Sequence, residues 1–248
     1  MKALKLGAAA VLAFAISGCG DDAAGGNAAA EQNFQVEKIA APNGGDWASV
    51  VSETPEGGFR MGNPDAKVKV VEFGSMTCGV CAAFAAEGEP ALIDKYVKSG
   101  QVSFEFRNFV RDGADLSAAL LARCSGPSAF FPLTDQLFAA QNEWLGKLQT
   151  MSPEQQQQLG TLPPGQAAVG FAQAAGLDQF VRVRGIPAAK AQSCLADAGQ
   201  VQRLVSMNET AVKEHQISGT PTFLINNNVV PNSANWATLE PAIQQSLR

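Results

Sequence analysis

Alternating apolar and polar residues predict the strands of a single sheet. Residues 67–73 form a mostly apolar run typical of a buried strand, and residues 101–107 alternate between apolar and polar side chains. A helical pattern over residues 79–98 joins these two strands, so we expect them to pair in parallel. Residues 57–61 predict a short strand before them.

A long helical segment follows the predicted strands. From residue 111 to 215 the apolar spacing is helical throughout, and no strand pattern interrupts it. Residues 222–230, with an Asn-rich turn at their centre, then predict a hairpin, and residues 236–246 a last helix. The sequence therefore predicts an α/β fold, in which helices flank a central mixed sheet and a large all-helical segment is inserted at 111–215.

The N-terminal end has the pattern of an export signal. Two lysines precede an apolar stretch of about 11 residues, too short to span a bilayer, and residues 1–18 are predicted to be a signal peptide. Residues 16–19, Ile-Ser-Gly-Cys, resemble the lipobox of bacterial lipoproteins. That resemblance implies cleavage before Cys19 and attachment of lipid to its sulfur; ordinary secretion, with cleavage near Cys19, is the alternative.

Composition separates a tether from a domain. Residues 19–56 are rich in Ala, Gly, Asn and acidic side chains, and we expect a lipidated, mostly irregular tether. The sheet-forming domain is predicted at residues 57–110 and 216–248, interrupted by the helical insertion at 111–215. No dimerisation segment is recognisable, so we expect a monomer.

The charge balance excludes one class of partner. Removal of residues 1–18 leaves 16 basic and 23 acidic side chains. A surface with this excess of negative charge does not favour binding to nucleic acid.

A Cys-x-x-Cys pair carries the candidate chemistry. Cys78-Gly79-Val80-Cys81 stands where the strand at 67–73 gives way to the following helix. The N-terminus of a helix presents unpaired N–H groups and about half a positive charge, which favours thiolate over thiol. Thiolate is the form that attacks disulfides, so the pair predicts redox chemistry with Cys78 and Cys81 as catalytic residues.

Two further cysteines stand apart from this pair. If Cys19 carries lipid, Cys124 and Cys194 complete an even set, and in an oxidising compartment they could form a structural disulfide. The alternative is that they are two separate buried thiols.

The chain resembles the DsbA-like branch of the thioredoxin superfamily. The resemblance rests on the Cys-x-x-Cys pair after a strand, on Gly219-Thr220-Pro221-Thr222 before another strand, and on the helical segment between them. It covers roughly residues 57–248 and implies a thioredoxin-like fold with a cis peptide bond at Pro221. It further implies that substrate binds along Thr220 and Pro221 and over the surface around Cys78, including Gly79 and Val80.

Glu72 is the third candidate catalytic residue. It lies six residues before Cys78, where the superfamily often has a buried carboxyl group beneath the disulfide. An acid in an apolar strand is costly unless it has a role, and here the role would be to accept the proton of Cys81, through water. The alternative is a glutamate that reaches solvent at the edge of a strand.

The direction of exchange is left open by the motif. Gly79 and Val80 replace the Pro-His of strongly oxidising members, so the imidazole that helps to stabilise the thiolate in those members is missing. The oxidase or isomerase direction is nevertheless favoured overall. The resemblance implies unfolded or extended exported polypeptides as substrates and a membrane redox partner, DsbB-like or DsbD-like. It implies a periplasmic protein anchored through Cys19, with no cofactor beyond the Cys78–Cys81 disulfide.

A non-catalytic protein is the alternative function. Cys78 and Cys81 could belong to a metal site or to a chaperone-like binder, but a zinc site needs two more ligands at short spacing. Cys124 and Cys194 stand alone in the sequence, so we expect no metal. The single histidine, His215, is interpreted as a helix C-terminal residue that interacts with the helix dipole.

Overall fold

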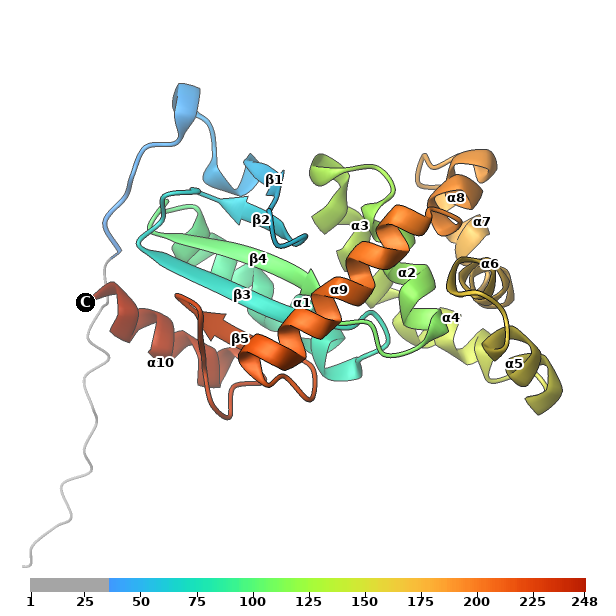
Figure 1. The fold of residues 1–248 in the computed structure, drawn as a ribbon. Helices are drawn as coiled ribbons and strands as arrows, with labels where there is room; N and C mark the ends of the chain where they lie inside the picture. The colour runs from blue at the N-terminus through green and yellow to red at the C-terminus, as the bar shows by residue number, and fades with distance from the viewer. Residues whose placement is uncertain (1–35) are drawn as a thin grey trace, which may run out of the picture. The chain divides into compact units, whose positions relative to one another are not determined.

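Strands from distant parts of the chain form one mixed sheet (Figure 1). In residues 36–248, which the computed structural model describes, the order of the six strands is β1-β2-β4-β3-β5-β6. Their bounds are β1 Val51–Glu53, β2 Phe59–Gly62, β3 Val68–Gly74, β4 Val102–Asn108, β5 Thr222–Ile225 and β6 Asn228–Val229. Only β3 and β4 pair in parallel among these strands, and the other pairs are antiparallel.

The central strand β3 leads directly into the first long helix. Every β3 residue except Lys69 is buried, as expected for a strand covered on both faces. Helix α1 (Gly79–Leu92) follows, then a π-helical turn, η3 (Ile93–Val97), and the chain returns as β4. The predicted parallel pair is therefore confirmed, with α1 as its crossover.

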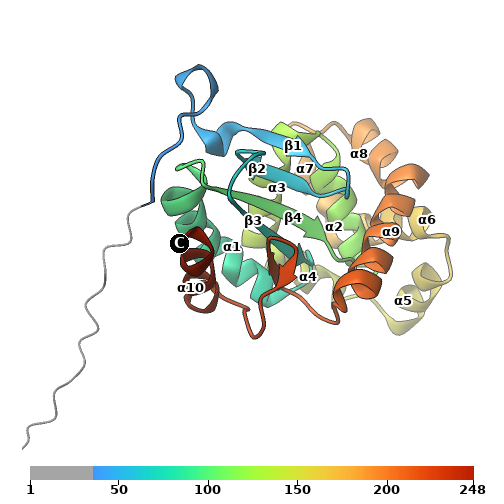
Figure 2. The same cartoon turned by 60° about the vertical axis from the view of Figure 1, so that its left-hand side comes forward.

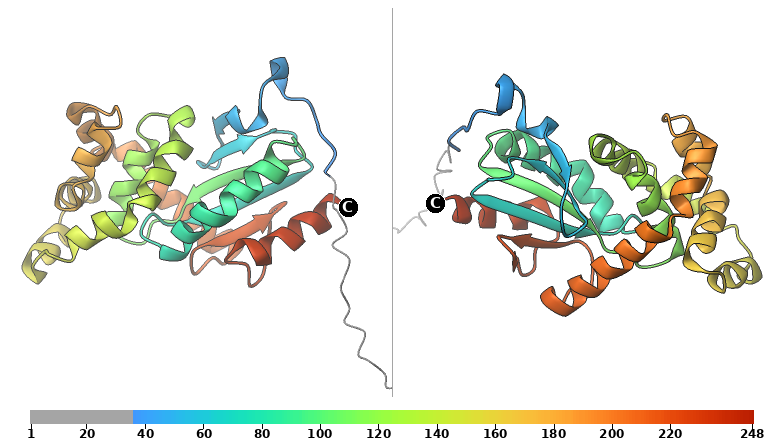
Figure 3. Two further views of the ribbon diagram at one scale, coloured as in Figure 1. Left: turned by 180° about the vertical axis from the view of Figure 1, so that it is seen from behind. Right: turned by 45° about the horizontal axis from the view of Figure 1, so that its top comes forward.

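Different helices cover the two faces of the sheet. On one face, Val71 and Phe73 of β3 pack with Ala211 of α9 (Ala198–His215), the helix that crosses in front of the sheet in Figure 1. On the other face, Phe223 of β5 contacts Phe84 of α1, with ring centroids 4.6 Å apart. Helix α10 (Trp236–Leu247) packs beside α1 on that same face (Figures 2 and 3).

The segment between β4 and β5 is helical, as predicted. Its core is α2 (Gly113–Arg123), which is buried along almost its whole length and contacts α3, α6, α8 and α9. The remaining helices are α3 Pro127–Ala139, α4 Gln141–Leu148, α5 Pro153–Gly160, α6 Pro164–Ala175, α7 Leu177–Arg182 and α8 Ala188–Leu195. Because α9 packs on both α2 and the sheet, the segment forms one compact unit with the rest of the described chain.

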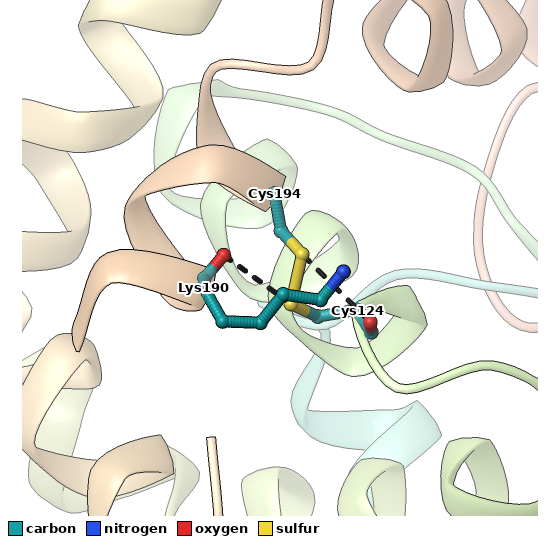
Figure 4. Close-up of a disulfide and its surroundings, with 3 residues drawn as sticks. All are labelled: Cys124, Lys190 and Cys194. Atoms are coloured by element: carbon teal, nitrogen blue, oxygen red, sulfur yellow. Dashed lines mark hydrogen bonds between the residues drawn. A yellow bond between two sulfur atoms is a disulfide. The ribbon is translucent and has the colours of Figure 1, made fainter. Parts of the chain in front are cut away.

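A disulfide joins Cys124, at the end of α2, to Cys194 in α8 (Figure 4). The two Cα atoms are 5.6 Å apart, although 70 residues separate them in the sequence. The Cys124 sulfur lies 3.7 Å from the carbonyl oxygen of Lys190, and Lys190 belongs to the same helix, α8, as Cys194. The bridge therefore closes the helical segment on itself, away from the Cys-x-x-Cys pair.

The described chain is ordered before the predicted start of the domain. Two short 3₁₀ helices, η1 (Pro42–Gly44) and η2 (Trp47–Ser49), precede β1, and the buried Trp47 donates a hydrogen bond of 2.8 Å to the Ile39 carbonyl. β1 thus lies within residues 19–56, which the sequence assigned to the tether. The signal peptide, Cys19 and the tether as far as residue 35 lie outside the described residues.

The observed order of strand, helix, strand, helical segment, hairpin and helix confirms the predicted thioredoxin-like α/β fold. Within residues 36–248, no helix combines the length and the apolar character needed to cross a membrane.

Candidate active site

Cys78 stands at the start of α1 and caps it. Its backbone is extended, and its Sγ accepts a hydrogen bond of 3.3 Å from the Cys81 N–H group. Cys81 lies one turn into the helix and is fully buried, whereas Gly79 and Val80 between them are exposed. The predicted pair therefore lies on one helical turn as two free, buried thiols, with Cys78 the outer one at 5% exposed and Cys81 the inner one at 0%.

A loop from the other end of the chain reaches Cys78. The peptide bond between Thr220 and Pro221 is cis, and Cys78 Sγ lies 3.3 Å from the Thr220 carbonyl oxygen. Thr220 is partly exposed, and Pro221 is buried beneath it. Thr220, Gly79 and Val80 therefore border the outer sulfur together.

The two thiols differ strongly in acidity. The pKa of Cys78 is lowered to about 5, chiefly by a hydrogen bond with the Cys81 side chain, against the opposing effect of burial. Thr220 and the backbone N–H groups of Val80 and Cys81 lower it further. Burial raises the pKa of Cys81 well above that of an ordinary thiol, and the hydrogen bond with Cys78 and the charge of Glu72 add to the rise. At neutral pH Cys78 is thus the thiolate and Cys81 the thiol.

Glu72 lies beneath the pair on β3. It is 1% exposed, and burial, followed by the charge of Cys78, raises the pKa of its carboxyl group. A Cβ atom at the nearby Gly74 would lie 3.0 Å from Glu72 Oε1 and 2.5 Å from the Phe106 ring, so this glycine leaves room for the carboxyl group. Oε1 has no hydrogen-bond partner in the protein. Glu72 is therefore an inner acid that faces the thiols, not one that reaches solvent at a strand edge.

Residues of the helical segment hold the loop before Cys78. The fully buried Asp115 of α2 accepts hydrogen bonds from Ser75 Oγ, at 2.5 Å, and from the Met76 N–H group, at 2.8 Å. Gln141 of α4 donates through Nε2 to the carbonyl oxygens of Met76 and Cys78, at 2.8 and 3.0 Å. Sequence reasoning missed both residues, because nothing near them in the sequence marks a contact with the loop.

Two predicted residues lie away from this site, and one lies outside the described chain. Cys124 and Cys194 form the disulfide of the helical segment, and Cys19 precedes residue 36. His215 ends α9, where its ring contacts Phe73 at a centroid distance of 5.8 Å on the opposite face of the sheet from Glu72. In the described residues, no group of three or more His, Cys, Asp or Glu side chains is placed to hold a metal ion.

Comparison with known protein families agrees with this geometry. The family model described as Thioredoxin matches residues 54–245, which include both thiols, Glu72 and the cis-proline loop. The chain belongs to this thioredoxin family.

Related members of the thioredoxin family are named for disulfide chemistry. The crystal structure of a protein-disulfide isomerase from Novosphingobium aromaticivorans has a TM-score of 0.73 and 32% identity, and the match covers 76% of this chain and 96% of that one. Disulfide bond formation protein D of Bacillus subtilis is 24% identical over 76% of each chain. Wolbachia pipientis α-DsbA1, 18% identical with a TM-score of 0.63, shares the fold.

A Rickettsia bellii protein, provisionally named a protein-disulfide oxidoreductase, is 27% identical over 79% of this chain and 69% of its own length. The match covers less of two other Rickettsia relatives, 41% of the R. typhi protein and 53% of the R. prowazekii protein. Together, the dithiol and these relatives confirm the class predicted from the sequence, a DsbA-like thiol:disulfide oxidoreductase.

Proposed function

We propose that this protein exchanges disulfides with exported proteins, in the oxidase or isomerase direction, through Cys78 and Cys81. The observation that carries the proposal is the lowered pKa of the Cys78 thiol, whose sulfur lies beside the Thr220 carbonyl group at the start of α1. Stabilisation of the thiolate stabilises the reduced enzyme, and a stabilised reduced form makes the disulfide a stronger oxidant.

Oxidation of a substrate begins with the Cys78–Cys81 disulfide. A substrate thiolate attacks Cys78 Sγ, so the bond between the enzyme sulfurs breaks, a mixed disulfide forms, and Cys81 leaves and takes up a proton. A second substrate thiolate then attacks the substrate sulfur of the mixed disulfide. Cys78 leaves as a thiolate, the substrate has lost two electrons to form its disulfide, and the enzyme is the reduced dithiol.

Isomerisation begins from the dithiol instead. The Cys78 thiolate attacks a substrate disulfide, which forms a mixed disulfide and releases one substrate thiolate. A different substrate thiolate then attacks the substrate sulfur of the mixed disulfide, so that a new substrate disulfide forms and Cys78 leaves as a thiolate. If the mixed disulfide persists, Cys81 loses its proton and attacks Cys78, so that the bond to the substrate breaks, the substrate sulfur leaves as a thiolate, and the enzyme disulfide is restored. Because burial raises the pKa of Cys81, this step needs a base, and Glu72 is the proposed acceptor.

The proposed docking surface consists of Thr220, Pro221, Gly79 and Val80. Val80 is 49% exposed beside the reactive sulfur, which suits contact with an apolar side chain of an unfolded polypeptide. A backbone segment placed beside Thr220 can pair with an extended peptide, as in other forms of strand addition.

The proposed setting is the periplasm, with lipid on Cys19 holding the protein at a membrane. Each catalytic cycle changes the redox state of Cys78 and Cys81, so a membrane partner, DsbB-like for oxidation or DsbD-like for reduction, must restore it. We propose that the chain acts as a monomer and needs no cofactor besides the Cys78–Cys81 disulfide.

The test combines two activity assays with a measurement of potential. Wild-type protein should oxidise a dithiol peptide and accelerate insulin reduction, and Cys78→Ser should do neither. Cys81→Ser should accumulate a mixed disulfide that mass spectrometry detects.

Equilibration with glutathione measures the reduction potential of the Cys78–Cys81 pair and so gives the direction of exchange. A potential near that of DsbA, about −120 mV, indicates an oxidase, and a potential near that of thioredoxin, about −270 mV, indicates a reductase. Inactive wild-type protein that retains zinc through chelation would favour the non-catalytic alternative.

A further inference from the structure

A second buried acid lies in the active-site helix. Glu89 of α1 is 5% exposed, and its Oε1 has no hydrogen-bond partner in the protein. Burial, then the charges of Asp135 and Glu72, raise the pKa of this carboxyl group. An unpaired buried carboxyl group is costly, and a second buried acid that adds to the cost calls for an explanation.

Two other acids act electrostatically on Glu89, a buried one and an exposed one. Glu72 comes from β3, on the sheet face that α1 covers, and Asp135 comes from α3, which packs against α1. These two residues, from two different elements, are the titratable groups whose charges act on Glu89. Glu72 in turn interacts electrostatically with both Cys78 and Cys81.

The outer end of this series meets solvent. Asp135 is exposed on α3, yet partial burial of its carboxyl group raises its pKa to about 6. A group with a pKa in this range both accepts and releases protons near neutral pH. Cys81, by contrast, is fully buried and has no solvent contact of its own.

Other unpaired polar atoms lie near the inner end. Asn108 of β4 is 1% exposed, and both its Nδ2 and its Oδ1 lack partners. β4 pairs with β3 so that Gly74 is opposite Asn108 and Glu72 is opposite Phe106, which places Glu72 and Asn108 on the same face. Buried polar atoms of this kind are the ones that internal water satisfies.

We propose that Glu89 is a positioning residue in a proton path that runs from Cys81 through Glu72 and Glu89 to Asp135 and solvent. The inference rests on the proposed function, because the path serves the step in which Cys81 resolves the mixed disulfide. In that step the Cys81 proton passes to Glu72, the Cys81 thiolate forms its bond to Cys78, and the substrate sulfur leaves as a thiolate. The proton on Glu72 then leaves through Glu89 and Asp135, and the reverse sequence protonates Cys81 during substrate oxidation.

The experiment measures resolution of a preformed mixed disulfide between Cys78 and a peptide, by stopped flow from pH 5 to 9. Glu89→Gln keeps the shape of the side chain and cannot carry a proton, and we expect it to slow resolution about tenfold near pH 7 and to shift the pH profile. Glu89→Asp should recover most of the rate. Glu87→Gln, on the exposed side of the same helix, is the matched control and should match the wild type.

Asp135→Asn provides a second variant at the outer end, where a substitution is easily tolerated. It should slow resolution and alter the pH profile in the same sense as Glu89→Gln, and it decides the question alone if Glu89→Gln does not fold. Alkylation of Cys78 should be unchanged within about twofold in both variants, because that reaction needs no proton from Cys81.

Wild-type rates and pH profiles in the folded variants would overturn the proton path while leaving the proposed function intact. Absence of exchange in the wild type would instead overturn the proposed function itself.

Discussion

Cys78 Sγ lies 3.3 Å from the carbonyl oxygen of Thr220, although 142 residues separate the two in the sequence. The antiparallel pairing of β3 with β5 makes this contact possible. It sets Phe73 opposite Thr222 and so brings the start of α1 and the loop before β5 to the same end of the sheet. The reactive sulfur and the proposed docking backbone are therefore set by the sheet, not by local sequence.

Alkylation of reduced protein should report Cys78 as the acidic thiol. Because its pKa is lowered to about 5, the rate should rise through that pH and level off above it, whereas a free cysteine titrates at about 8.5. The hydrogen bond from Cys81 is the main cause, so Cys81→Ala should shift the midpoint upward. Iodoacetamide kinetics from pH 3 to 9 measure the midpoints of the wild type and of Cys81→Ala. A wild-type midpoint near pH 8.5 would contradict the lowered pKa of Cys78.

Glu72→Gln should slow resolution of the mixed disulfide by about 10- to 100-fold at neutral pH, because it removes the group proposed to accept the Cys81 proton. The first attack by Cys78 should change much less. Stopped-flow measurement of the two steps separates them, with far-UV circular dichroism to confirm an unchanged fold. Equal resolution rates in variant and wild type would remove Glu72 from the mechanism.

Glu89→Gln should stabilise the protein increasingly as the pH rises. Burial raises the Glu89 pKa in the folded chain above its unfolded value of about 4.3. The contribution of this group to stability is therefore full below that pH and is lost as the pH rises toward the folded pKa. Glutamine does not titrate and avoids this loss. The difference in Tm between the variant and the wild type should therefore increase, in favour of the variant, from pH 4 to pH 8.

Each kcal/mol gained in this way corresponds to about 2–4 °C in Tm. Scanning calorimetry of wild type, Glu89→Gln and the exposed control Glu87→Gln measures the difference. A constant gap between Glu89→Gln and wild type across this pH range would show that Glu89 does not titrate abnormally.

Loss of the disulfide should destabilise the fold and spare the chemistry. The bond closes a loop across 70 residues, so Cys124→Ala/Cys194→Ala should lose about 2–4 kcal/mol of unfolding free energy. Cys78 alkylation should be unaffected, since the bridge lies in the helical segment. Urea unfolding measures the first effect, and thiol counting of denatured, unreduced wild type checks the bridge. Free thiols at both positions would refute it.

Gln141→Leu should loosen the loop before Cys78. It leaves the carbonyl oxygens of Met76 and Cys78 without their shared donor, at a cost of about 1–3 kcal/mol. The free energy of unfolding, measured with urea, and the rate of insulin reduction should both fall. The control Gln157→Leu, on the exposed surface of α5, should change neither. A variant as stable and active as the control would show that the loop holds its shape without Gln141.

Much of the fold could be predicted because its signals are local. Val68 to Phe73 and the Cys-x-x-Cys pair mark a strand and a helix start within a few residues, and the Thr220-Pro221 motif marks the second half of the site. β1 was not predicted, since a strand of three residues has too few positions for an alternating pattern.

The supporting residues of the site depend on tertiary packing and have no local signal. In the sequence Glu89 is one of two glutamates in α1, and only the tertiary packing of that helix shows that Glu89 is buried while Glu87 is exposed. Asp115 and Gln141 likewise resemble ordinary helix residues until the fold sets them against residues 75–78. The two cysteines were therefore predictable, and the residues that hold the loop before them or lie buried in α1 were not.

The hydrogen bonds that Asp115 accepts from Ser75 and Met76 connect the helical segment to the loop that precedes Cys78. Helix α2 is enclosed by its neighbours in the helical segment and holds the chain just ahead of the nucleophile. If α2 moved, Ser75 and Met76 would be expected to move with it, and the orientation of Cys78 Sγ toward a substrate disulfide would change. The inserted helices thus help to set the position of the residues that precede Cys78.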